Sequence, residues 1–542
     1  MTAGTPELNL RVAGGDGLAL ATDVYPASGP APVVLTRTAY GRSAHRAEGL
    51  AWAARGFGFV AQDVRGRYDS DGTWCPYRGE RADGAALVDW VLRQPWCDGR
   101  IVTTGGSYAG YTAWAAAVTR PDAVRAVLST GPAMGLNRVK FDPSGILRLA
   151  EHATWWLTRA ESRTSRDGLV TDVARHDPQW LHHLPVFGIA QRMWARLNHW
   201  TDTICAGPGA AGLEAITDAE LAAFPGAAFH VGGWYDLLLA ETLHQWAVVG
   251  SGLDPRPERQ LVLGPWDHGF VWAPTTRIGG RDHGPESRVP LGPRQLAWLR
   301  KVLGSVERAA EPGAAASHDV EAGTAADGVA GGSRAEVFIV GEGWRTSSDW
   351  PPRTAATVLW AHGDGALRDT APATGSDRTF RYDPVAPFPS TEPGADRVSL
   401  DARADVARWC GEPLGRPIAL AGTACVLLAA RTDAPATDWV VRLSERTTDG
   451  RVLPLASAAV DTARSPGEFH RIELTPLAVR IPAGSRLELE VTSSDFPYLA
   501  RSLNTGADRY TTTVTAVATQ TIHTGPDGTR VSLPVVGAEG VA

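Results

Sequence analysis

Continuous apolar runs and helical segments alternate over the first 130 residues of the chain. Residues 8–26 alternate between polar and apolar in the manner of antiparallel strands. Unbroken apolar runs follow at 31–36, 57–63 and 123–129, with helical patterns between them. Such runs are typical of parallel strands, which helices cover on both faces. The pattern therefore predicts βαβ units on a parallel sheet, an α/β fold.

The pattern changes from about residue 131 to residue 225, where helical segments replace strands. Large aromatics are frequent there, among them Trp155, Trp156, Trp180, Trp194 and Trp200. Apolar strands resume at 227–233 and 259–264. A helical insertion within a sheet protein usually forms a cap over an active site. We expect most of these tryptophans to fill the core of that insertion, and one or two to face a pocket.

A third kind of sequence follows residue 307. Residues 308–333 are rich in Ala and Gly without apolar periodicity, which indicates a linker or a surface insertion. Short alternating strands then dominate, at 336–340, 425–431, 439–445 and 487–491, and predict a β-sandwich. The predicted division is an α/β domain in two parts at 1–130 and 227–307, a helical cap at 131–226, a linker at 308–333 and a β domain at 334–542.

Length and charge limit the kinds of function. With 542 residues the chain is too long for one compact core, which agrees with several domains. A net charge of −7 is mild, so nothing points to nucleic acid or an anionic membrane as a partner. The sequence contains no apolar stretch of about 18 residues, so no membrane span is predicted. The chain alone leaves open whether the protein forms a homo-oligomer.

The cysteines and the N-terminus indicate the compartment. The five cysteines (Cys75, Cys97, Cys205, Cys410 and Cys425) are few, odd in number and without metal-ligand spacing. A reducing cytoplasm fits them best, although a bridge between Cys75 and Cys97 stays open. The first residues lack a basic segment followed by an apolar one, so no secretory signal is expected. We therefore expect a cytoplasmic protein.

The candidate chemistry centres on the segment Ile101–Gly110, with the sequence IVTTGGSYAG. A β-rich run meets a Gly-Gly-Ser-Tyr-Ala-Gly turn, and a helix of small residues follows at once. This is the form of a nucleophile elbow, which presents a serine hydroxyl above a parallel sheet. Gly105 and Ala109 would let strand and helix approach closely. Ser107 is the candidate nucleophile, and an ordinary βα turn is the alternative.

A base and an acid follow Ser107 in the order that such an elbow requires. Asp236 comes just after the strand at 229–231, and His268 just after the strand at 261–263. The spacing of 32 positions from Asp236 to His268 fits one intervening helix, so both would lie at the ends of adjacent strands. Each alone has an ordinary interpretation, a helix N-cap for Asp236 and a turn histidine for His268. Asp267 competes as the acid, but a sequence neighbour rarely has the geometry to orient the ring. Together, order and placement favour a Ser-His-Asp triad.

An acyl-transfer site also needs donors for the developing oxyanion. The backbone N–H of Tyr108, the residue after the candidate nucleophile, is one such donor. The second donor should come from a loop after an early strand, such as residues 36–42. Tyr40 in that loop carries a hydroxyl, although the pattern alone favours a structural tyrosine.

Several segments of the sequence resemble those of the CocE/NonD hydrolases, which are relatives of bacterial cocaine esterase, X-prolyl dipeptidyl-peptidase and the α-amino-acid ester hydrolases. The matching segments are Arg37–Arg42, Gln62–Tyr68 with Ser70–Gly72, Gln94–Gly99, Gly105–Gly110, Gly233–Asp236, Gly264–His268, Ser493–Pro497 and Asn504–Gly506. They run over nearly the whole chain. The resemblance implies an α/β-hydrolase domain with a helical cap insertion and a C-terminal all-β jelly-roll domain.

The resemblance also implies roles for single residues. It makes Ser107 the nucleophile, His268 the base and Asp236 the acid, with Tyr40 and the Tyr108 amide as oxyanion donors. It implies no cofactor and no metal, and a small ester, amide or short peptide as substrate. A cocaine-esterase-like esterase is favoured by the tryptophan-rich cap. The alternatives are an X-prolyl dipeptidyl-peptidase, an α-amino-acid ester hydrolase or acylase, an acyltransferase, and a ligand-binding protein without catalysis.

Overall fold

A ten-stranded mixed sheet forms the first part of the protein. The computed structural model describes residues 4–193, 198–207, 215–271, 275–304 and 332–537. The sheet contains β1 (Glu7–Ala13), β2 (Ala19–Tyr25), β3 (Ala31–Thr38), β4 (Gly58–Asp63), β5 (Cys97–Ser107), β6 (Val124–Pro132), β7 (Ala227–Tyr235), β8 (Arg259–Asp267), β11 (Arg334–Ile339) and β12 (Gly343–Ser347). Their order is β1-β2-β4-β3-β5-β6-β7-β8-β11-β12, and the strands from β4 to β11 are parallel. The predicted parallel sheet is confirmed.

Helices cover both faces of this sheet. They are α1 (Arg46–Ala53), α2 (Glu80–Leu92), α3 (Tyr108–Thr119), α10 (Leu239–Val248) and α11 (Leu291–Val302). All eight residues of β3 are buried. Its neighbouring side chains enter different cores, because Val33 packs with residues of α2 and α3 whereas Val34 packs with residues of α1 and α11. Burial on both faces explains why these strands are continuous apolar runs.

Between β6 and β7 the described residues form the predicted helical cap region. Its helices are α4 (Leu136–Lys140), α5 (Leu149–Thr158), α6 (Leu169–His176), α7 (Ile189–Arg192), α8 (Asn198–Ala206) and α9 (Asp218–Ala222). Trp156, Trp180 and Trp200 are buried, as expected for tryptophans that fill the core of this insertion. Trp194 lies outside the described residues.

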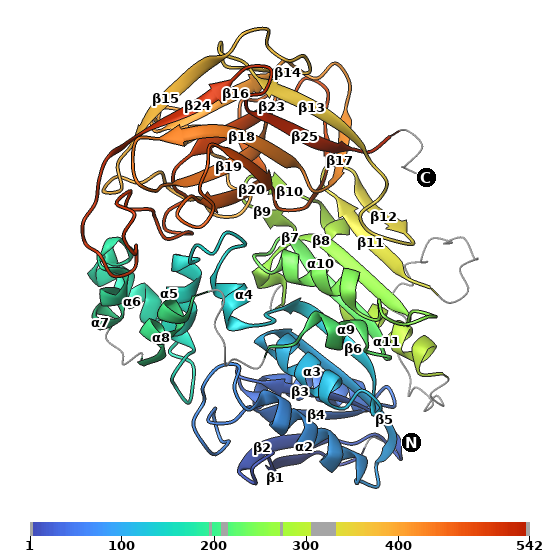
Figure 1. Cartoon of the computed structure of the whole chain (residues 1–542). Coiled ribbons are helices and arrows are strands. Elements are labelled where there is room, and N and C mark those ends of the chain that lie inside the picture. The colour runs from blue at the N-terminus through green and yellow to red at the C-terminus, as the bar shows by residue number, and fades with distance from the viewer. Residues whose placement is uncertain (1–3, 194–197, 208–214, 272–274, 305–331, 538–542) are drawn as a thin grey trace.

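The C-terminal part is β-rich. Its strands are β13 (Ala355–Ala361), β14 (Ala366–Arg368), β15 (Ser376–Tyr382), β16 (Val406–Gly411), β17 (Ile418–Gly422), β18 (Cys425–Thr432), β19 (Asp438–Arg446), β20 (Val452–Asp461), β21 (Phe469–Glu473), β22 (Leu477–Ile481), β23 (Arg486–Thr492), β24 (Ala518–Thr524) and β25 (Arg530–Val535). They form one 13-stranded arrangement around a separate apolar core. Figure 1 shows these strands above both the first sheet and the cap helices. The fold is therefore an α/β-hydrolase type with a separate C-terminal β region.

The strand predicted at 336–340 forms, but its assignment to the C-terminal β-sandwich is wrong. β11 pairs in parallel with β8, with Ala335 opposite Leu261, and β12 then extends the same sheet. Alternation along 336–340 identifies a strand but contains no information about its partner. The open edge of β8 accepts β11, so residues 334–347 complete the first sheet.

The remaining features are the linker region, short secondary-structure elements and the cysteines. Residues 305–331, most of the linker predicted at 308–333, lie outside the described residues. Short elements are the hairpin β9 (Arg277–Ile278) and β10 (Arg281–Asp282), and 3-10 turns at Arg42–His45, Trp180–His182, Val186–Gly188, His268–Val271, Pro285–Ser287 and Val398–Leu400.

All five cysteines lie in described ranges and are free thiols, so Cys75 and Cys97 are not bridged. None of the helices in these ranges combines the length and the apolar character needed to cross a bilayer.

Candidate active site

Ser107 lies on a sharp turn between β5 and α3. Its backbone has a φ of 57° and a ψ of −126°, a left-handed conformation that is rare outside glycine and that clusters at functional sites. A Cβ atom at Gly105 would overlap the carbonyl oxygen of Ala109, so only glycine fits this position. The side chain of Ala109, in contrast, is accommodated in the buried interior. Close packing of strand and helix thus explains one glycine of the motif and permits alanine at the other position.

The structure brings Ser107, His268 and Asp236 into one hydrogen-bonded chain. The Nε2 atom of His268 lies 3.0 Å from Oγ of Ser107, and its Nδ1 atom lies 2.9 Å from Oδ1 of Asp236. His268 follows β8 and Asp236 follows β7, which are adjacent parallel strands. The Asp267 carboxylate instead accepts a hydrogen bond from the Gly269 N–H at 2.9 Å. Asp236 is therefore the carboxylate that orients the His268 ring.

Two backbone features hold the Asp236 carboxylate. The N–H of Leu238 donates to Oδ1 at 2.8 Å, which fixes the oxygen that faces His268. Gly131, at the end of β6, lies against the other oxygen. A Cβ atom there would be 2.8 Å from Oδ2, and the φ of Gly131 is 44°. Gly131 is a site residue that the sequence analysis missed, because a single glycine in a strand carries no signal of what packs against it.

The environment of His268 favours its protonated form. Burial of the ring opposes protonation. The charge of Asp236 and its hydrogen bond, with smaller contributions from Glu151 and Asp267, outweigh burial and raise the pKa of His268 above its usual value of 6.5. A histidine next to a serine hydroxyl can then accept the hydroxyl proton and stay stable as imidazolium.

Tyr40 presents its hydroxyl to the same serine. It follows β3, and its hydroxyl lies 3.4 Å from Oγ of Ser107. The Tyr40 N–H donates to Oγ1 of Thr38 at 3.0 Å, and the Tyr68 hydroxyl donates to the carbonyl oxygen of Tyr40 at 3.0 Å. The guanidinium of Arg159 lies 5.9 Å from the centroid of the Tyr40 ring. These contacts from both sides hold the phenol at the candidate nucleophile.

Only the backbone of Tyr108 is free for chemistry. Its hydroxyl donates to Oε1 of Glu80 at 2.7 Å and accepts from the Tyr77 N–H at 2.9 Å, and the side chain is buried. Tyr108 is the first residue of α3, where the backbone N–H has no acceptor within its own helix. The side chain therefore anchors the elbow, and the backbone N–H at the start of α3 remains available as a hydrogen-bond donor.

One cap tryptophan approaches this centre. Trp155 on α5 is half-buried, and its ring stacks on the Tyr108 ring with centroids 6.4 Å apart and 27° between the planes. Among the described residues, no three His, Cys, Asp or Glu side chains come together in a way that could hold a metal ion.

Two family models cover most of the chain. The X-Pro dipeptidyl-peptidase (S15 family) model matches residues 16–270, and the X-Pro dipeptidyl-peptidase C-terminal non-catalytic domain matches residues 323–531. The cocaine esterase of Rhodococcus sp. (strain MB1 Bresler) is 28% identical over 97% of this chain and 98% of that protein. The chain therefore combines an S15-family domain with the C-terminal domain of that family, and it is a serine hydrolase.

Other proteins are similar to this S15-family hydrolase over part or nearly all of the chain. A putative serine esterase of Mycobacterium bovis is 30% identical over 32% of this chain and 31% of that protein. Two solved structures share the fold over its whole length. An α-amino acid ester hydrolase has a TM-score of 0.78 at 19% identity, covering 98% of this chain and 96% of that one. An aminopeptidase from a Thaumarchaeota archaeon has a TM-score of 0.76 at 21% identity, covering 99% and 96%.

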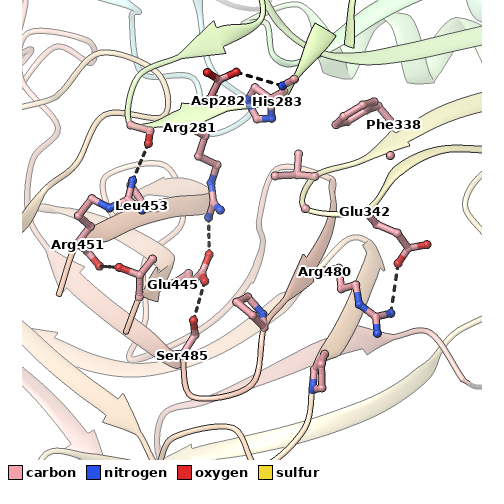
Figure 2. Close-up of a pocket in the computed structure, with 18 of the residues that line it drawn as sticks. Arg281, Asp282, His283, Phe338, Glu342, Glu445, Arg451, Leu453, Arg480 and Ser485 are labelled. Atoms are coloured by element: carbon pink, nitrogen blue, oxygen red, sulfur yellow. Dashed lines mark hydrogen bonds and ion pairs between the residues drawn. The ribbon is translucent and has the colours of Figure 1, made fainter. Parts of the chain in front are cut away.

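This S15-family hydrolase also has a polar cavity of about 940 Å³ away from Ser107 (Figure 2). Residues of the β9–β10 hairpin, the β11–β12 turn and the C-terminal strands line it. Glu445 pairs with Arg281 at 2.6 Å and accepts from Oγ of Ser485 at 2.8 Å. Arg480 faces Glu342 at 3.3 Å. These paired charges join the β9–β10 hairpin and the β11–β12 turn to the C-terminal strands.

Proposed function

We propose that this S15-family hydrolase is a serine esterase that cleaves carboxylic esters through an acyl-enzyme. Ser107 is the nucleophile, His268 the general base and acid, and Asp236 the carboxylate that orients the ring. The hydroxyl of Tyr40 and the N–H of Tyr108 stabilise the oxyanion. The observation that carries this proposal is the continuous chain from Oγ of Ser107 through both His268 nitrogens to Asp236, with contacts of 3.0 and 2.9 Å.

The proposed reaction has two halves. Oγ of Ser107 attacks the ester carbonyl while Nε2 of His268 takes the hydroxyl proton, and the tetrahedral oxyanion faces Tyr40 and the Tyr108 N–H. Collapse breaks the bond to the alcohol oxygen, which leaves with the proton from His268. Water then attacks the acyl-enzyme, His268 takes a water proton, and the second collapse returns that proton to Oγ and releases the carboxylic acid.

Esters are favoured over peptides with a free N-terminus for two reasons. A curated relative that matches nearly the full length of the chain is a cocaine esterase. Recognition of a free amine also needs an available carboxylate near the nucleophile. Glu241 is already paired with Arg138 at 2.9 Å, and the charge of Glu151 is partly balanced by Lys140. An X-prolyl dipeptidyl-peptidase is therefore the second candidate, supported by the matching family model.

A pair of substrates separates the two candidates. We expect hydrolysis of p-nitrophenyl acetate, and equal, slow release of p-nitroaniline from Gly-Pro p-nitroanilide and its N-acetylated form. An X-prolyl dipeptidyl-peptidase would instead cleave the free-amine peptide selectively. Spectrophotometric initial rates, with S107A as the blank, measure all three. Selective cleavage of Gly-Pro p-nitroanilide contradicts the esterase assignment, and no turnover of any of the three contradicts a hydrolytic site at Ser107.

Removal of the Tyr40 hydroxyl tests the oxyanion site. We expect Y40F to lower kcat by about 100- to 1,000-fold with little change in KM, because the hydroxyl stabilises charge that exists only in the transition state. Steady-state kinetics on p-nitrophenyl acetate measure the effect. Y382F is the matched control, since that buried hydroxyl donates to the Ser502 carbonyl oxygen in the C-terminal part. A kcat for Y40F within threefold of the wild type would remove Tyr40 from the mechanism.

A further inference from the structure

Lys140 is a buried cation that the proposed mechanism does not use. It ends the cap helix α4 and is 4% exposed. No carboxylate in the part of the chain that the structure describes lies within ion-pair distance of it, although a buried lysine ordinarily has such a partner. It is one of only two lysines, with Lys301, among 52 cationic side chains. Glu151 acts on Lys140 through its charge alone and not through an ion pair, so the ammonium is available to a further anion.

Lys140 lies beside the candidate active site and not in a remote part of the cap. Its Nζ atom is 4.5 Å from the centroid of the Trp155 ring, which in turn stacks on Tyr108 next to the nucleophile. The preceding strand β6 ends at Pro132, opposite Ser107, and the N–H of Ala133 donates to the Ser107 carbonyl oxygen at 3.0 Å. Helix α4 begins three residues later and extends about 7.5 Å.

Among the described residues, one carboxylate and one further cation act on Lys140. The Glu151 carboxylate, on α5, raises the pKa of both Lys140 and His268, so it lies near both groups. Arg148 adds a second cation, whose guanidinium donates to the Val139 carbonyl oxygen at 2.9 Å. Burial, opposed only by Glu151, lowers the pKa of Lys140 to about 7. Arg148 also acts on the carboxylates of Asp142 and Glu241, whereas Glu151 is the one carboxylate in the described ranges that acts on Lys140.

We propose that Lys140 is a specificity-determining residue that selects ester substrates carrying a carboxylate. The inference rests on the proposed function, because it assigns the substrate class of the site at Ser107. A substrate carboxylate that binds next to Trp155 would accept a charge-assisted hydrogen bond from the Lys140 ammonium. A substrate with a free ammonium would meet Lys140 and Arg148 instead, which is unfavourable.

Two pairs of rigid aromatic esters test this selection. Phenyl 4-carboxybenzoate with phenyl benzoate places the carboxylate on the acyl side, and 4-acetoxybenzoate with phenyl acetate places it on the alcohol side. The para geometry prevents the carboxylate from attacking its own ester. We expect the wild type to prefer the anionic member of one pair by about tenfold in kcat/KM, which is the effect of one charge-assisted hydrogen bond. Intrinsic reactivity cancels when the same ratio is compared between variants.

Variants at two positions make the test specific. K140M is expected to abolish the preference and K140R to retain it. K301M is the matched control, since Lys301 is exposed and pairs with Glu258. A melting temperature close to that of the wild type shows that K140M is folded. If K140M does not fold, K140E tests the same point, and a folded K140E variant should disfavour the anionic ester of the pair.

The outcomes separate the two proposals. No preference in either pair, or a preference that persists in K140M, overturns the role of Lys140 while hydrolysis of the neutral esters still supports the esterase. Failure to hydrolyse both neutral and anionic esters overturns the proposed function itself. A preference that disappears in K140M and not in K301M supports the inference.

Discussion

S107A is expected to lower kcat for a simple aryl ester on the order of 10⁶-fold. Without Oγ no acyl-enzyme forms, and His268 has no hydroxyl proton to accept. The residual rate would come from the oxyanion donors and substrate binding alone. Steady-state release of phenol from phenyl acetate measures the loss, because this ester is less prone to background attack than a nitrophenyl ester.

Two further measurements show whether the loss is chemical. A fluorophosphonate probe should label the wild type and not S107A, because only an activated serine attacks phosphorus. The variant should keep its melting temperature, since alanine at φ 57° is no more strained than serine and the side chain is small and buried. S287A, at another buried serine outside the candidate site, is the matched control. Activity above about one thousandth of the wild type in folded S107A would place the nucleophile elsewhere.

Sequence alone predicted the parallel sheet and its candidate site because both depend on local patterns. Burial on both faces requires apolar side chains at successive positions, so β3 appears as an unbroken run. The elbow requires glycine at 105, since any Cβ atom there would overlap Ala109. Asp236 and His268 follow adjacent parallel strands, and their order places them at the same sheet edge.

Features that depend on contacts between distant segments were beyond the sequence. The alternating pattern of 336–340 indicates a strand, but only the structure shows that β8 is its partner. Tyr40 looked like a structural tyrosine by pattern alone, and only the resemblance to the CocE/NonD hydrolases suggested otherwise. Its hydroxyl comes within 3.4 Å of Ser107 because β3 lies beside β5. Gly131 and Lys140 have no motif, and their positions follow from how β6 and α4 pack against the site.

D236A is expected to lower kcat/KM by about 10⁴-fold, because the His268 ring loses its orientation and the imidazolium loses its counter-charge. D236N should lose less than D236A. The Leu238 N–H holds an acceptor at the Oδ1 position, so the amide oxygen of asparagine would still face Nδ1 of His268 and keep the ring in its productive tautomer. Steady-state kinetics on both variants show whether kcat/KM of D236N exceeds that of D236A. An asparagine variant as inactive as the alanine variant would mean that the negative charge, and not the tautomer, dominates.

The pH profile gives a second readout of the same contact. His268 must be neutral to accept the Ser107 proton, so activity falls as the pH decreases through its pKa, which Asp236 raises above 6.5. Removing that charge lowers the pKa, so the acid limb of kcat/KM should move to lower pH in D236N even though the rate falls. D267N should move the limb much less, because Asp267 acts on His268 through charge alone and contributes least among the named carboxylates. An acid limb that stays in place in D236N would show that the group titrating there is not the His268 ring held by Asp236.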